Sequence, residues 1–224
     1  MASEIVAYVG IDNFDVILYQ ASILSRMNQK VLVLELSETG KEGAISKLIP
    51  IPKGMELNKE LVTFRKIDFA RFFPSEDIIN RYDKVLISCG NYVALLPSRV
   101  SKVIFVTDLF PYNMNAVKAM MKNVTFVKRG ILVRNNVRSC VNQELVFEEV
   151  EGLVDKEDIN ILDQDENDLF NAVLIQHGQH FQFNTISLKM KRYLLKETRK
   201  YCPEADKKTI KIAFNIAKKG GITS

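Results

Sequence analysis

Runs of apolar residues alternate along the chain with stretches of mixed apolar and polar residues. Nearly unbroken apolar runs at residues 5–9, 31–36, 85–87 and 102–107 are typical of parallel strands that are covered on both faces. Between the first two runs, apolar residues recur at helical spacing from Phe14 to Leu24. This strand–helix–strand pattern predicts a three-layer α/β/α fold with a mainly parallel sheet.

The pattern is less regular between residues 38 and 80. We expect an irregular connection with a short helix at 42–48, followed by a short strand at 61–64. Helical spacing over residues 67–80 predicts a helix that Pro74 interrupts and that restarts at Ser75.

Two later segments have clear helical spacing. The first has a stripe of Met114, Val117, Met120 and Met121, which we interpret as core packing because methionine fills irregular gaps in cores. The second, residues 187–200, is expected to turn its apolar side inward and its lysines outward. Its predicted inward residues are Leu188, Tyr193, Leu194 and Leu195.

Length and composition fit one α/β domain over residues 1–203. The 224 residues, 47% of them hydrophobic and 26% charged, suffice for a large core. The three cysteines, Cys89, Cys140 and Cys202, are too widely separated to suggest a disulfide framework or a zinc site. No run of eighteen apolar residues is present, so we expect a cytoplasmic protein without a membrane-spanning segment.

The turn after the first predicted strand is where α/β folds usually bind phosphates. Residues 4–40 resemble the amino terminus of the MinD/ParA family of ATPases, in which the first strand runs into the sequence KGGxGKT. An alignment without gaps places Tyr8 on the family's first lysine and Gly10 on its second glycine. Asn13 then takes the position of the phosphate-binding lysine, and Phe14 that of the magnesium-binding hydroxyl.

Two acidic positions of the family are also changed. In the segment YDKVLISCGNY, residues 82–92, Ser88 stands where the family has an aspartate that orders a magnesium-bound water. Of the acidic pair after the second strand, Glu35 is present and Ser37 replaces the other acid. A magnesium–triphosphate site needs a cation, a hydroxyl and carboxylates. The resemblance therefore implies that neither ATP nor magnesium is bound.

Asp12 and Asp15 add negative charge where a triphosphate would have to lie, and like charges repel. Asp12 is also placed to cap the following helix, where its carboxylate would accept hydrogen bonds from free backbone N–H groups. Asp12 can be an ordinary helix cap and also have its carboxylate in the place that a bound anion would take; the two interpretations are compatible.

Residues 204–224 form a basic amphipathic segment. Residues 189–219 carry eleven Lys or Arg against three Asp or Glu, a net charge of +8, whereas the 20 basic and 24 acidic residues elsewhere give −4 and the whole chain is +4. Alternation from Ile210 to Ile216 also fits a strand. In the resembling family such a helix reaches anionic membranes. We identify a candidate membrane or partner surface at Lys207, Lys208, Lys211, Phe214, Lys218 and Lys219. We favour a closing helix, because Ile212 and Ile216 widen its apolar side.

Two other polar pairs are candidate ligand sites. His177 and His180 have the spacing of metal ligands, but Gly178 and the absence of clustered cysteines in the sequence favour a loop at a helix end. Asn135 or Asn136 lies near the place of the family's adenine-contacting asparagine, and a turn explains this pair equally well.

The resemblance implies a catalytically degenerate MinD/ParA-like protein that regulates or positions a membrane-associated, pilus, secretion or partition assembly through protein contacts. A homodimer, or a heterodimer with a related ATPase, is expected. One alternative is a working ATPase with an atypical loop. Another is a nucleic-acid binder that uses the basic tail with Lys128, Arg129, Arg134 and Arg138. A dinucleotide-dependent oxidoreductase is disfavoured, because its glycine pattern is missing after the first strand.

Overall fold

The computed structural model describes residues 3–11, 13–36, 48–56, 59–137, 143–177 and 183–219. These residues form one eight-stranded sheet with the order β3-β4-β2-β5-β1-β6-β7-β8. The strands are β1 (Glu4–Gly10), β2 (Val31–Glu35), β3 (Val62–Phe64), β4 (Ile67–Ala70), β5 (Lys84–Ser88), β6 (Lys102–Thr107), β7 (Lys128–Asn136) and β8 (Ile159–Asp163). Within this sheet all neighbours are parallel except β3 and β4.

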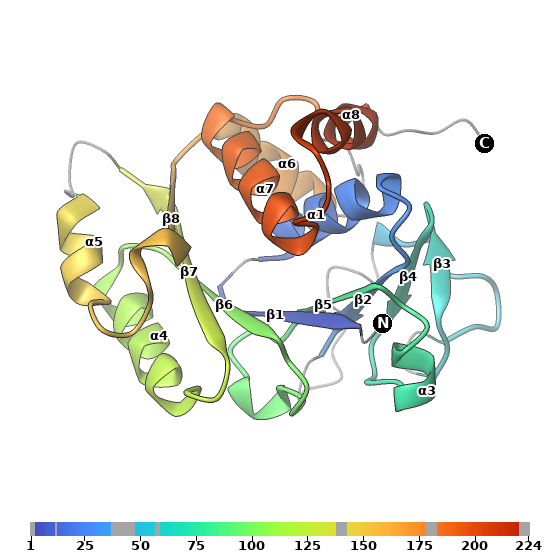
Figure 1. Ribbon diagram of the computed structural model, residues 1–224, viewed down its shortest axis with the longest axis horizontal. Coiled ribbons are helices and arrows are strands. Elements are labelled where there is room, and N and C mark those ends of the chain that lie inside the picture. The colour runs from blue at the N-terminus through green and yellow to red at the C-terminus, as the bar shows by residue number, and fades with distance from the viewer. Residues whose placement is uncertain are drawn as a thin grey trace.

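Helices cover both faces of the sheet (Figure 1). One face carries α1 (Phe14–Arg26), α6 (Glu166–Gln176), α7 (Leu188–Tyr201) and α8 (Lys207–Lys218). The other carries α3 (Glu76–Ile79), α4 (Pro111–Asn123) and α5 (Gln143–Glu149), with the short 3-10 helices η1 (Val93–Leu95) and η2 (Lys156–Asp158) in the connections. The prediction of a three-layer α/β/α fold with a mainly parallel sheet is confirmed.

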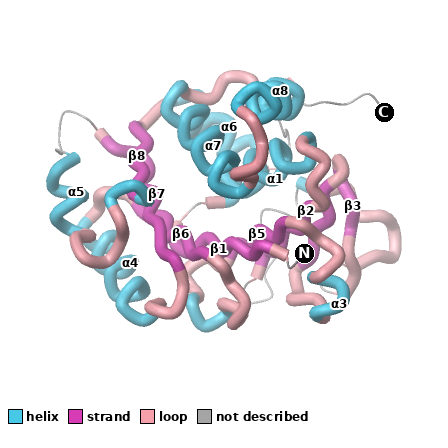
Figure 2. The backbone as a smooth tube through the Cα atoms, in the orientation of Figure 1, coloured by secondary structure: helices cyan, strands magenta, loops and turns pink. Residues whose placement is uncertain are grey.

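Helix α1 lies between the sheet and the helices α6, α7 and α8 (Figure 2). Of its 13 residues, 12 are buried, including Val16 and Ile23, which lie off the main apolar stripe. A helix with protein on both sides must be apolar around most of its circumference. Helix α1 is accordingly part of the core and not a surface helix.

The prediction of a helix over residues 67–80 is wrong in its first half. Ile67–Ala70 forms β4, which pairs in parallel with β2 and antiparallel with β3. Arg65 and Lys66 both have positive φ, 53° and 67°, so they form the tight turn that joins β3 to β4. The restart is correct, because α3 follows Ser75 directly. Of the expected helix at 42–48, only Leu48 lies within the described residues.

The carboxyl-terminal helices close one face of the domain. Tyr193 and Leu194 of α7 are buried as predicted, but Leu188 is 71% exposed, because it occupies the first position of the helix beyond the packed region. Helix α8 packs against α1 and α7. No described helix has the length and apolarity required to cross a bilayer.

Candidate functional site

The carboxyl ends of β1, β5 and β2 place three of the sequence-predicted positions at one edge of the sheet. Gly10 ends β1, Ser88 ends β5, and Glu35, the last residue of β2, is paired in register with Ser88. Because these strands are neighbours, their ends meet beside the start of α1, where Asn13 precedes the first helical residue.

Asn13 and Ser88 are hydrogen-bonded to each other. Ser88 Oγ donates to Asn13 Oδ1 at 2.9 Å, and Asn13 Nδ2 donates to the carbonyl oxygen of Gly10 at 3.5 Å. Both side chains are buried. The sequence alignment to the MinD/ParA family predicts a lysine and an aspartate at these positions; this structure has a neutral amide and a hydroxyl that are hydrogen-bonded to each other.

The turn between β1 and α1 is short and held against its neighbours. Only residues 11–13 separate Gly10 from Phe14. The N–H group of Gly10 donates to the carbonyl oxygen of Gly90 at 2.6 Å, and that of Ile11 donates to the carbonyl oxygen of Val106 at 3.1 Å. A Cβ at Gly10, where φ is +120°, would lie 1.9 Å from the Val106 oxygen. Glycine is therefore required for the close approach of β1 to β6.

Tyr8 and Phe14 belong to the core. Tyr8 lies within β1, is fully buried, and its hydroxyl is 3.0 Å from that of Tyr201 on α7. Burial raises the pKa of Tyr8 far above its ordinary value. Phe14 is 7% exposed and packs in the cluster that α1, α7 and α8 share. Neither side chain is placed to bind a phosphate or a metal ion.

Asp15 and Arg134 form a buried bidentate ion pair. The guanidinium Nη1 and Nη2 atoms lie 2.7 and 2.8 Å from the two carboxylate oxygens. This contact corrects two interpretations of the sequence. Asp15 faces β7 and its charge is compensated, so it does not present a bare carboxylate to the turn. Arg134 is 7% exposed and engaged, so it is not available to nucleic acid.

Of the remaining positions of the predicted site, one forms an ion pair within the fold and two lie outside the described residues. Glu35 is 8% exposed, with Oε2 at 3.8 Å from Arg71 Nε. Asp12 and Ser37 lie outside the described residues. A cavity of about 250 Å³ next to the turn is lined by Gly10, Ile11, Asn91, Tyr112, Asn113, Ala116, Val117 and Met120. None of these described lining residues is a cation.

The other candidate ligands are engaged in the fold. Asn136 Nδ2 donates to Asp163 Oδ1 at 3.1 Å, while Asn135 is exposed and has a left-handed φ of 55°. His177 ends α6, and the structure does not describe His180. No group of metal-ligating side chains occurs among the described residues.

Two other cations of the candidate nucleic-acid surface also contact groups of the protein itself. Lys128 Nζ lies 3.0 Å from Asp158 Oδ2, and Arg129 donates to the carbonyl oxygen of Met121. Arg138 lies outside the described residues.

Helix α8 resolves the ambiguity at the carboxyl terminus. Phe214 is fully buried and cannot belong to the surface to which the sequence assigned it. Ile212 and Ile216, which were expected to widen a buried apolar side, are 49% and 43% exposed. The buried residues of α8 are Ile210, Ala213, Phe214 and Ala217, and its outer side includes Lys207, Lys208 and Lys211, with Lys218 and Lys219 at its end.

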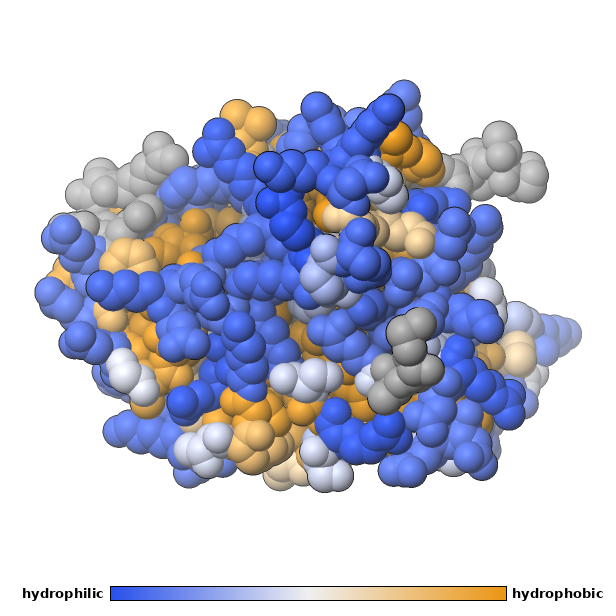
Figure 3. Space-filling model, viewed as in Figure 1, coloured by the Kyte–Doolittle hydropathy of each residue, from blue (hydrophilic) through white to orange (hydrophobic). Residues whose placement is uncertain are grey.

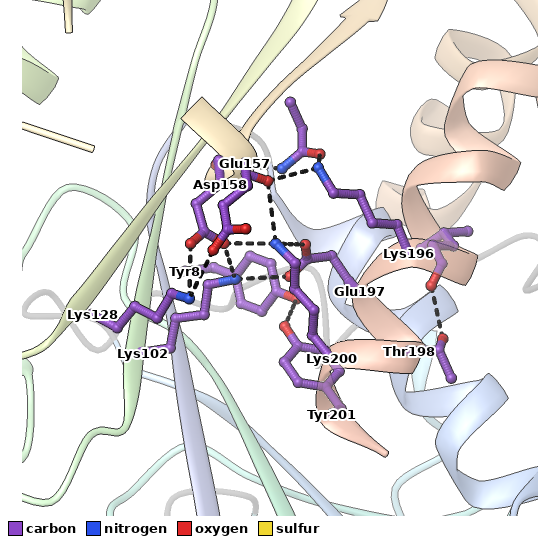
Figure 4. Close-up of polar contacts among 12 residues, drawn as sticks. Tyr8, Lys102, Lys128, Glu157, Asp158, Lys196, Glu197, Thr198, Lys200 and Tyr201 are labelled. Carbon is purple, nitrogen blue, oxygen red and sulfur yellow. Dashed lines mark hydrogen bonds and ion pairs between the residues drawn. The ribbon is translucent and has the colours of Figure 1, made fainter. Parts of the chain in front are cut away.

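Sequence reasoning missed a buried ion cluster between α7 and the amino ends of β6 and β8 (Figure 4). Lys102 Nζ lies 3.0 Å from both Asp158 Oδ1 and Glu197 Oε2. Lys200 reaches the same two carboxylates at 2.6 and 3.2 Å. The available signal was a lysine at the head of the apolar run VIFVT.

Solved structures with a similar fold are MinD and plasmid partition proteins, although their sequences are only 10–14% identical to this chain. No protein-family model matches the sequence, and no curated protein matches it in sequence. A chain of the MinC:MinD cell division protein complex from Aquifex aeolicus superposes with a TM-score of 0.64 at 14% identity, over 91% of this chain and 97% of that one. MinD from Aquifex aeolicus gives 0.60 at 13% identity, over 91% and 98%. A plasmid partition protein from Borrelia burgdorferi gives 0.54 at 10% identity, over 92% and 100%.

Proposed function

We propose that this chain, which has the MinD/ParA-like fold, has lost nucleotide chemistry and works as a positioning or partition module through protein contacts. The observation that carries this proposal is the hydrogen bond between Ser88 and Asn13. This neutral, mutually satisfied pair supports the proposal, because a triphosphate and its magnesium ion would require a cation and a carboxylate at the two aligned positions.

The backbone supports the same proposal. Phosphate sites at helix N-termini work because several backbone N–H groups point at the ligand. Here the N–H groups of Gly10 and Ile11 point at the carbonyl oxygens of Gly90 and Val106. A triphosphate could use these two N–H groups only by displacing both hydrogen bonds, and it would gain no lysine from Asn13.

Exposed aromatic side chains beside the turn favour a protein ligand. Phe110 and Tyr112, at the start of α4, are 70% and 83% exposed, and Tyr112 lines the cavity next to Gly10. Large apolar side chains that lie together on a surface often mark a site where another protein binds. We propose that a homodimer, or a heterodimer with a related ATPase, uses this edge.

A titration with a fluorescent ATP analogue, with and without magnesium, tests the loss of nucleotide binding. We expect no saturable binding up to about 1 mM. The Asn13→Asp variant, which keeps the side-chain size and adds a negative charge, is the matched control. Micromolar, magnesium-dependent binding that Asn13→Asp abolishes would overturn the proposal.

Sedimentation velocity at micromolar concentration, alone and with a tagged partner recovered from cells, tests the contact edge. We expect Phe110→Ser with Tyr112→Ser to reduce association. Phe126→Ser is the control, because Phe126 is also exposed, at 61%, but precedes the amino end of β7, whereas Phe110 and Tyr112 follow the carboxyl end of the parallel strand β6. Equal association of all variants would exclude this edge as the interface.

A further inference from the structure

Strand β8 is an edge of the sheet. Within the described sheet it pairs with β7 alone. Alternate backbone N–H and C=O groups of an edge strand point away from its neighbour and can pair with another chain. Among the described residues, none outside β7 hydrogen-bonds to the backbone of Asn160, Ile161 or Leu162.

A cleft of about 350 Å³ follows this edge. Its floor is formed by residues 159–162 of β8, and Phe147 of α5 lies on one side of it. On the other side, α7 contributes Lys189, Arg192, Tyr193 and Lys196. Figure 3 shows apolar surface where β8 lies, between α5 and the hydrophilic surface of α7. The two sides of the cleft therefore differ in chemistry.

The α7 side is positively charged along the strand. Lys189, Arg192 and Lys196 are three and four residues apart, so they lie on one side of the helix. Lys189 Nζ is 2.8 Å from Asp163 Oδ1, and Lys196 Nζ donates to Asn160 Oδ1 at 2.8 Å. Arg192 is exposed and forms no ion pair with any described residue.

We propose that β8 binds an extended acidic segment of a partner protein as an added strand. Side chains of a strand alternate between its two faces, so the bound segment would turn acidic residues toward Arg192 and apolar residues toward Phe147. Lysines near an edge oppose indiscriminate strand addition, and here they select for acidic segments. This inference goes beyond the proposed function, because it depends on the edge of the sheet and not on the turn after β1.

Fluorescence anisotropy with a labelled peptide of about seven residues that alternates Glu and Val tests the proposal. We expect saturable binding in the micromolar range, and none for a peptide that alternates Lys and Val. We also expect slower amide hydrogen exchange at residues 160–162 in the complex, since the outward N–H groups become paired.

Arg192→Glu should weaken binding of the Glu/Val peptide about fivefold or more and allow the Lys/Val peptide to bind. Arg192 has no partner among the described residues, so the variant should fold normally, which circular dichroism checks. Lys211→Glu on α8 makes the same charge change elsewhere and should leave binding unchanged. Equal weakening by both variants would show that only net charge matters. Lack of binding of the Glu/Val peptide at about 1 mM would show that the lysines only prevent strand addition at β8. Either result would overturn the proposal.

Discussion

Replacing Lys102 with methionine tests whether the buried ion cluster holds α7 to the sheet. Lys102 is 8% exposed and is the only one of the three lysines in this cluster that is almost fully buried. Its ammonium group contacts Asp158 and Glu197, whose side chains are 0% and 1% exposed, at 3.0 Å each. Methionine keeps most of the side-chain volume and removes the charge, so the effect reports on electrostatics.

The expected loss of stability is about 3 kcal/mol. Removing one partner of a buried ion pair destabilises a protein by about 3 to 5 kcal/mol, because a buried charge is left uncompensated. Lys200 remains within 3.2 Å of both carboxylates and provides part of the compensation, which places the value at the lower end. Lys128 contacts the same Asp158 at 3.0 Å, but its side chain is 50% exposed. Lys128→Met should therefore cost less than about 1 kcal/mol.

Urea unfolding followed by circular dichroism, with linear extrapolation, measures both variants against the unmodified protein. A double variant, Lys102→Met with Glu197→Gln, should recover about 1 kcal/mol, because it also removes one of the carboxylates left without its cation. If Lys102→Met and Lys128→Met cost the same, burial does not set the strength of these contacts and the reasoning is refuted.

The pH dependence provides an independent check. Burial by itself would raise the pKa of Asp158, but hydrogen bonds from Lys200, Lys128 and Lys102 outweigh it and hold that pKa well below its ordinary value. A depressed pKa contributes stability at pH values above the unfolded pKa of about 4, and this contribution is lost as the pH falls further. The difference between Lys102→Met and the unmodified protein should therefore shrink below about pH 4.

Three further predictions concern the turn after β1, two buried cysteines and helix α8. Gly10→Ala should lower stability by about 2 kcal/mol or more, because φ is +120° and the new Cβ meets backbone; thermal unfolding measures this, and an unchanged melting temperature would contradict it. Burial raises the pKa of Cys89 to about 12 and that of Cys202 to about 11. Iodoacetamide at pH 8 should therefore label neither thiol until the protein unfolds, which mass spectrometry measures. Rapid labelling of the native protein would contradict the burial of these thiols. Because Phe214 is buried, we expect Ile212→Glu with Ile216→Glu to leave flotation with anionic vesicles unchanged, and a clear loss would instead establish membrane contact.

The pattern of apolar residues determined the layers of this protein. Runs such as residues 5–9 and 103–106 are apolar throughout because both faces of a central parallel strand are covered, so each residue of the run must be suited to burial. The spacing of α1 likewise followed from its own burial. Gly10, Asn13 and Ser88, which the resemblance assigns to one site, lie beside one another, because parallel strands bring their carboxyl ends to one edge.

Tertiary structure alone decided where the charges lie. Asp15 and Arg134 are 119 residues apart and Lys102 and Glu197 are 95 apart, so no local periodicity joins them. Ile67–Ala70 has helical spacing, but pairing with β2 and β3 makes it a strand. Local sequence fixes which residues must be buried, whereas the choice of partner for a buried charge depends on long-range packing, since an unpaired charge in the core is too unfavourable to persist.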